Sequence, residues 1–273
     1  MRLAFSFLGV LLVLSQLGCG GGEKAVTLRL RLEKGKGYVF ESSVNQTTQG
    51  VGGSKTEAEQ KLVTTVKVDD ASEGKYKTTS TISDVEIVSA ALGAEQKAAL
   101  KSQIEAVKLQ IEYDELGHSL GSKTPDAGAL AATMGAQGVG FMGLHYPSRP
   151  VKVGDKWSAE FDIQEVLGSM LAGLKAKGST KIPIAYTLKT LESRGGKSVA
   201  VIAFDMGGEI AFTVDRPDGQ AAEVKMKTDS KGEYVVDAAT GLPLESTTTG
   251  RNDIDAMGQK ISQEMKILVK YRG

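Results

Sequence analysis

The residues of this chain that could do acid–base or metal chemistry are few and widely spaced. It has two histidines, His118 and His145, and neither has a second histidine or a cysteine at metal-ligand spacing. A serine hydrolase would need one of them as its base, but the chain contains no G-x-S-x-G turn. We therefore expect His118 to be a solvated turn residue and His145 to pack beside its aromatic and proline neighbours. The pattern predicts no catalytic residue and no metal ligand.

Acidic pairs and one glycine-rich segment are the other candidates. Asp253 and Asp255 could act as paired carboxylates or hold a cation, but a solvated loop is the simpler interpretation, and Asp69–Asp70 is interpreted in the same way. The segment Gly138–Gly143 spells G-x-G-x-x-G, which binds dinucleotides between a strand and a helix whose N-terminus receives the pyrophosphate. An alanine-rich segment precedes it and a Tyr-Pro dipeptide follows. We therefore expect a flexible apolar loop and no cofactor.

Charge and composition restrict the class of protein. Lys+Arg and Asp+Glu both number 33, so no net charge draws the chain to nucleic acid. Hydrophobic residues make up 41%, which is ordinary for a globular core, and the 33 glycines with threonine-rich runs favour strands joined by turns. The length of 273 residues suffices for one large β domain or two small ones.

Residues 1–18 have the pattern of a signal peptide. A single basic residue, Arg2, precedes an apolar run that is too short to span a membrane as a mature helix. The only cysteine, Cys19, follows Gly18, so the fold can contain no internal disulfide. The segment resembles a bacterial lipoprotein signal, although the leucine usual three positions before the cysteine is Gln16 here. The resemblance implies that Cys19 becomes the first mature residue and carries acyl chains such as palmitate.

The anchor predicts where the domain lies. Residues 19–24 form a tether that reaches roughly 20 Å at full extension, and several acyl chains on one cysteine would make the attachment stable. In double-membrane bacteria an aspartate after the cysteine commonly signals retention in the inner membrane, and Gly20 takes that place. We expect a lipid-anchored protein of the bacterial cell envelope, with the outer membrane favoured over the inner one.

The mature chain has two similar halves on either side of a central segment, Tyr146–Phe161, which holds two prolines and the only tryptophan. Gly35–Tyr38 aligns with Gly154–Trp157, and residues 66–75 align with 188–197, at an offset of about 120 residues. Each pair begins a strand or runs into a Gly-Lys turn. This order suggests a duplicated β unit. The alternative is that turn residues recur in any β protein.

We expect two β lobes, residues 25–145 and 146–273, with helices in the first. Val26 to Leu32 alternate apolar and polar residues with period two, which predicts a half-buried strand. Residues 93–104 predict a helix with one apolar stripe, and residues 126–134 are alanine-rich and predict a second.

One amphipathic segment in the second lobe is the sharpest candidate for a binding element. Ile163 to Lys177 predicts a helix that ends at Gly178. It could be a core helix packed on a sheet, a lid over an apolar cavity, or a helix on the membrane, although its sparse polar face disfavours the last. The positions that would cover a ligand are Ile163, Val166, Leu167, Met170, Leu171 and Leu174.

Several motifs resemble those of a known family. The lipoprotein signal, Leu30-Arg-Leu-Glu-Lys-Gly35, Pro150–Trp157 and Asp237–Gly241 together are similar to a family of uncharacterised bacterial lipoproteins, which implies no activity. The strand-rich plan also resembles the lipoprotein-carrier class of folds, in which a curved antiparallel sheet wraps around helices and holds acyl chains. Carrying that function over is an analogy at the level of fold.

These observations predict an α+β fold, mainly antiparallel β, whose two similar lobes can share one curved sheet that wraps helices. We expect a non-enzymatic lipoprotein that binds a lipid or hydrophobic ligand. The alternative is a module that binds another envelope protein through strand edges or loops. A third hypothesis, an enzyme, would require His145 or an acidic pair in a shared cleft.

Overall fold

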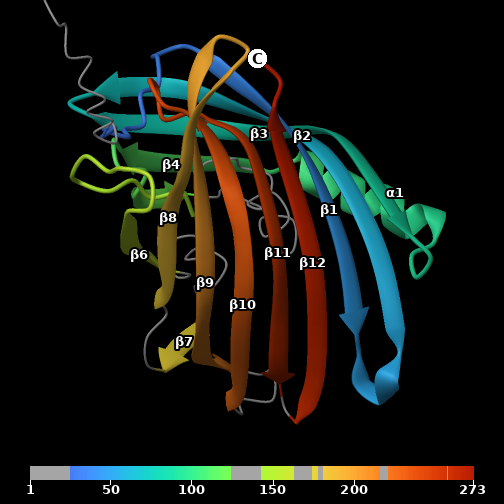
Figure 1. The fold of residues 1–273 in the computed structure, drawn as a ribbon. Helices are drawn as coiled ribbons and strands as arrows, with labels where there is room; N and C mark the ends of the chain where they lie inside the picture. Colours follow the sequence, from blue (N-terminus) through green and yellow to red (C-terminus); the bar gives the residue numbers. More distant parts are fainter. Residues whose placement is uncertain (1–24, 124–142, 163–173, 178–180, 216–220, 257) are drawn as a thin grey trace, which may run out of the picture.

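The computed structural model describes residues 25–123, 143–162, 174–177, 181–215, 221–256 and 258–273. In this part of the chain one large antiparallel sheet dominates, with one α-helix, α1 (Ala94–Glu105), and one 3-10 turn, η1 (Val51–Gly53) (Figure 1). The strands are β1 (Gly37–Gln49), β2 (Lys55–Ser72), β3 (Lys75–Ser89), β4 (Lys108–Asp114), β5 (Ser119–Lys123), β6 (Lys156–Asp162), β7 (Leu174–Lys177), β8 (Lys181–Arg194), β9 (Lys197–Asp215), β10 (Ala221–Asp237), β11 (Pro243–Ala256) and β12 (Gln259–Tyr271).

The sheet is one continuous meander in which the first and last strands lie side by side. Its order is β5-β4-β3-β2-β1-β12-β11-β10-β9-β8-β6, and β7 pairs with β9 off this path. The pairing of β1 with β12 joins the two halves of the chain, and β5 and β6 form the two ends of the path. The predicted antiparallel sheet shared by both halves is confirmed. The division into two similar lobes stays a prediction.

Alternating side chains give the sheet two different faces. Along β1, Tyr38, Phe40 and Val44 are buried, whereas Glu41 and Asn45 are exposed. We call the face with the buried side chains the inner face. One continuous core forms against it and includes Leu28, Leu30, Phe40, Val66, Tyr113, Tyr146, Tyr186, Ile202, Tyr234 and Val236.

The N-terminal segment corrects one prediction. Leu28, Leu30 and Leu32 are buried, as the alternation indicates, but the segment makes only an isolated bridge, Val26 with Val151, and no strand. Its N–H groups donate instead to turns at the end of the sheet, Leu30 to the carbonyl of Glu115 and Arg31 to that of Thr240, both at 2.8 Å. We call this end of the sheet the closed end; it is at the top of Figure 1.

The helix predicted at 93–104 is confirmed as α1. The N–H of Gly93 donates to the side chain of Gln96 at 2.9 Å, which satisfies one of the free donors at the helix start. On the apolar stripe, Ile104 is buried in a second core against side chains of β2 and β3. No helix among the described residues is long and apolar enough to cross a membrane.

The amphipathic segment of the second half is described only at its end. Residues 163–173 lie outside the described part of the chain, as do the helix predicted at 126–134 and most of the glycine-rich segment Gly138–Gly143. Residues 174–177, predicted to be helical, form the strand β7, so the predicted helix end is wrong. The reason is that β8 pairs with β9 only as far as Met206, which leaves backbone groups of residues 211–214 free to pair with β7.

Candidate functional site

The two ends of the sheet path, β5 and β6, border one cavity of about 230 Å³, which we call the seam cavity. Residues from the start of β8 and from the segment 143–145 complete its wall. Its apolar wall includes Ile111, Tyr113 and Phe161, and its polar wall consists of His118, Ser119, Ser122, His145, Glu160, Asp162 and Lys181. The cavity therefore combines an apolar side, continuous with the core, and a polar side.

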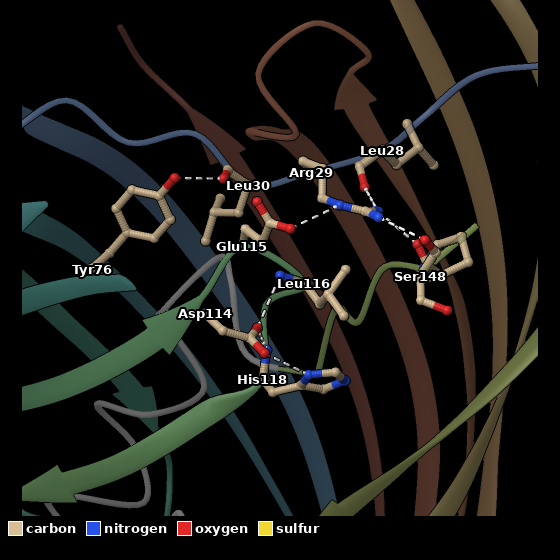
Figure 2. Close-up of polar contacts among 10 residues, drawn as sticks. Leu28, Arg29, Leu30, Tyr76, Asp114, Glu115, Leu116, His118 and Ser148 are labelled. Carbon is tan, nitrogen blue, oxygen red and sulfur yellow. Dashed lines mark hydrogen bonds and ion pairs between the residues drawn. The ribbon is translucent and has the colours of Figure 1, made fainter. Parts of the chain in front are cut away.

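The turn from β4 to β5 fixes the orientation of His118 (Figure 2). One oxygen of the Asp114 carboxylate accepts the N–H groups of Leu116 and His118 at 2.9 and 2.8 Å. The other oxygen lies 2.9 Å from His118 Nδ1. A carboxylate can only accept, so Nδ1 carries the hydrogen, and Nε2 of the neutral ring is left as an acceptor. Gly117 takes φ +82° here, where a Cβ would overlap the carbonyl oxygen of Leu144.

His145 lies against His118 although the two are distant in sequence. The ring centroids are 4.9 Å apart, with the planes tilted by 56°. The main chain of His145 is held from the opposite edge, because Trp157 Nε1 donates to its carbonyl oxygen at 2.8 Å and Trp157 stacks on Tyr186. The Tyr186 hydroxyl in turn donates to the carbonyl oxygen of Gly143. Residues 143–146 therefore connect the two edges of the sheet at the seam cavity.

The His145 side chain is buried and incompletely paired. It is only 8% exposed, and its Nδ1 has no hydrogen-bond partner. Burial, and secondarily the charge of nearby His118, lowers the pKa of His145 to about 4, against a smaller opposing effect of Asp114. His145 is therefore a neutral imidazole at neutral pH, with unused hydrogen-bonding capacity.

The sequence predicted a solvated His118 and a packed His145, and both statements hold in part. His118 is partly exposed and His145 is buried, but their contact and the Asp114 partnership were missed. The spacing Asp114-Glu-Leu-Gly-His118 was the available signal, since Asp side chains commonly bind N–H groups in the turn that follows them. Nothing local in the sequence indicates the contact with His145.

The closed end is held by one arginine and two tyrosines. The Arg29 guanidinium donates at 2.7 Å to the carbonyl oxygens of Leu28, Pro147 and Ser148, and it pairs with Glu115 at 3.3 Å (Figure 2). Two tyrosine hydroxyls also donate to carbonyl oxygens at this end, Tyr76 to Leu30 at 2.8 Å and Tyr146 to Gly241.

Beyond the core, the inner face carries a row of apolar side chains near the opposite ends of four strands. Ile210 in β9 pairs with Met226 in β10, Met226 with Ile254 in β11, and Ile254 with Ile261 in β12. Directly paired residues of antiparallel strands lie on the same side of a sheet, so these four form one strip, which we call the rim row. Ile210 is buried, whereas Met226, Ile254 and Ile261 are partly exposed.

The next level of the inner face toward the closed end is polar. The same register brings together hydroxyl and amide side chains from neighbouring strands, with one glycine at the end. This level consists of Gly208, Thr228, Asn252, Gln263, Thr48 and Thr56. The inner face is therefore banded, with an apolar core, a polar level and an apolar rim.

The outer face carries ion pairs and accounts for the predicted acidic pairs. Asp253 and Asp255 lie in β11 and not in a loop, and Arg251 binds Asp253 at 3.0 Å and lowers its pKa. Asp69 and Asp70 lie in β2. Among the described residues no three or more His, Cys, Asp or Glu side chains could hold a metal ion together.

The other predicted site residues lie where the structure gives no test. Cys19 and the first five ligand-covering positions fall outside the described residues, and of Leu174 only the strand assignment is described. Lipidation and the ligand-covering role therefore stay predictions.

Comparison with known proteins identifies a fold and no family. No family model and no curated protein matches the sequence. Among solved structures the chain is similar to lipovitellin, in a study of lipid–protein interactions, with a TM-score of 0.55 and 10% identity over 88% of this chain. The match covers 25% of the lipovitellin chain, so this protein spans a quarter of that length. A LolA superfamily protein from Nitrosomonas europaea, 10% identical over 89% of each chain, has a TM-score of 0.17, too low to establish a shared fold.

Proposed function

We propose that this protein is a lipid-anchored lipoprotein of the bacterial cell envelope that binds a lipid or another hydrophobic ligand along its inner face, without catalysis. The rim row carries the proposal. Three of its four side chains are apolar and partly exposed, and they adjoin each other across strands. Contiguous exposed apolar surface is costly in water and marks binding sites.

The charged outer face differs from the apolar rim row, and this supports binding of the ligand on the inner face. On the outer face, at the level of the rim row, Lys227 pairs with Glu209 at 3.7 Å and Arg251 pairs with Asp253. Charged side chains alternate with apolar ones along the same strands, so an apolar ligand fits the inner face better than the outer one. The fold shared with lipovitellin is compatible with a lipid ligand.

The non-catalytic character is part of the proposal. The enzyme hypothesis required His145 in a shared cleft, and His145 does lie with His118 in the seam cavity. However, Nδ1 of His118 binds the Asp114 carboxylate and Nδ1 of His145 has no partner, so neither of these nitrogens holds a hydroxyl or thiol group. A serine or cysteine nucleophile would need such a base within hydrogen-bond reach.

A pair of neighbouring residues on opposite faces tests ligand binding. Met226→Asp places a charge in the rim row, whereas Lys225→Asp changes the charge of an exposed outer-face side chain next to it. We expect native mass spectrometry to detect a lipid adduct on the wild type and on Lys225→Asp, and a loss of at least tenfold in occupancy on Met226→Asp. A protein that stays free of adducts with added lipids would overturn the proposal and favour the alternative, a module that binds another envelope protein.

The anchor is tested separately at Cys19. The wild-type protein should carry the mass of acyl chains and fractionate with membranes, and Cys19→Ser should lose both properties. Outer-membrane fractions are the expected location. An unmodified wild-type cysteine would refute the anchoring and leave ligand binding untouched.

A further inference from the structure

The seam cavity has room for part of a ligand. Its volume of about 230 Å³ equals that of roughly seven or eight waters in the liquid, and it is smaller than the pockets of about 300–1,000 Å³ that enclose whole drug-sized ligands. Its apolar wall is shared with the core of the inner face. A polar group at one end of an apolar molecule fits such a space.

The polar wall accepts more hydrogen bonds than it donates. His118 Nδ1–H is used by Asp114, so Nε2 offers a lone pair when the ring is neutral. His145 Nδ1 has no partner, and it offers a lone pair when the ring hydrogen is on Nε2. The carboxylate of Glu160 adds acceptor oxygens.

The wall of the seam cavity contains buried polar atoms that have no hydrogen-bond partner. His145 is more than nine-tenths buried, and both its Nδ1 and the Oγ of Ser119 are buried without a hydrogen-bond partner. Buried polar atoms nearly always have partners, because leaving them unpaired destabilises the fold. A ligand in the cavity would supply the missing partners of these two atoms.

The charges of the cavity disfavour an anion. Lys181 is the only cation among the described residues that line it, and it already pairs with Glu160 at 3.1 Å. Asp114 lies behind His118. A carboxylate or phosphate would meet lone pairs and negative charge, whereas a hydroxyl or an ammonium group would find acceptors.

We propose that the seam cavity is the headgroup subsite of the ligand and selects an amphipathic molecule whose headgroup donates hydrogen bonds. Such a headgroup is a glycerol or sugar hydroxyl, or a protonated amine, and it is preferred to an anionic one. This inference rests on the proposed binding of a hydrophobic ligand. The apolar part of the molecule would extend from the cavity along the core side.

Three ligands with the same chain and different headgroups test the selection. Trp157, the only tryptophan, donates to the carbonyl of His145 and reports binding at the cavity by its fluorescence. The purified full chain is titrated below micellar concentrations with 1-monooleoylglycerol, oleylamine and oleate. We expect 1-monooleoylglycerol and oleylamine to bind at least tenfold more tightly than oleate. The affinities of 1-monooleoylglycerol and oleylamine, compared with each other, show whether the cavity prefers a hydroxyl or an amine.

Variants separate recognition from folding. His145→Leu should retain binding, keep or raise the melting temperature, and reduce the preference over oleate to less than threefold. Ser119→Ala is a smaller change and should also weaken the preference over oleate. It keeps the test available if His145→Leu does not fold. Lys231→Leu, at an exposed position of β10, is the control and should change nothing.

The outcomes distinguish the two proposals. Equal or tighter binding of oleate, or a preference that survives both cavity variants, overturns the headgroup subsite and leaves the binding of a hydrophobic ligand intact. If none of the three ligands binds, the proposed function fails, and the headgroup subsite fails with it.

Discussion

Acid should destabilise this fold through His145. Burial and the charge of His118 lower the pKa of this side chain from 6.5 to about 4. Between those two values the unfolded chain binds a proton that the folded chain excludes. The ionisation of His145 therefore costs no stability above pH 6.5, and its cost grows as the pH falls from 6.5 toward 4. At about 1.4 kcal/mol for each pH unit in this interval, the loss reaches about 3 kcal/mol.

The assay is urea unfolding followed by the fluorescence of Trp157 at pH 7.5, 5.5 and 4.5. Carboxylates with lowered pKa values also lose stabilising interactions in acid: the N–H of Lys152 and then Arg149 lower the pKa of Asp155, and Arg251 lowers that of Asp253. They contribute equally in a variant that lacks only the imidazole. The informative quantity is therefore the free energy of unfolding of the wild type minus that of His145→Leu, compared across the three pH values.

Between pH 7.5 and 4.5 we expect the free energy of unfolding of the wild type to fall by about 2–3 kcal/mol more than that of His145→Leu. His118→Gln should retain most of the pH dependence, because burial is a larger cause of the lowered pKa than the charge of His118. Parallel pH profiles for the wild type and His145→Leu would refute the reasoning, since they would mean that His145 is solvated in the folded protein.

Two further predictions concern the closed end. Gly241 has φ +66°, and a Cβ there would overlap the carbonyl group of Arg29, so Gly241→Ala should lower the free energy of unfolding by about 2–4 kcal/mol in urea titrations. A loss below 1 kcal/mol would mean that the N-terminal segment does not pass over this turn. Arg29→Met keeps the apolar stem but loses three hydrogen bonds to carbonyl oxygens, and it should cost about 2 kcal/mol. Glu115→Gln should cost less than about 1 kcal/mol, because Glu115 is half exposed, and a reversed order would contradict the roles given to the two residues.

Much of the secondary structure follows from local sequence patterns. The apolar stripe that ends at Ile104 predicts α1, and the turn residues Ser72-Glu-Gly74 and Ala238–Gly241 predict the connections of β2 with β3 and of β10 with β11. Period-two alternation also predicts which side chains of a strand share a face, because successive residues of a strand point to opposite sides.

Other features depend on partners that are far away in the sequence. Val26 to Leu32 alternate like a strand, yet their N–H groups bind turns at the end of the sheet, since the central positions are taken by β1 and β12. Residues 174–177 continue a helical pattern but pair with the free edge of β9. In both places the backbone hydrogen bonds that are available decide the conformation, and the side-chain pattern does not encode them.

Sequence alone determined the apolar and charged faces of the strands, the turns between them and the absence of a net charge that would attract nucleic acid. The tertiary structure alone decided that β1 meets β12, that Ile210, Met226, Ile254 and Ile261 form one row, and that His118 meets His145 in a shared cavity. The physical reason is that strand register and the approach of two sheet edges are set by the packing of the whole inner face. No window of neighbouring residues contains that information.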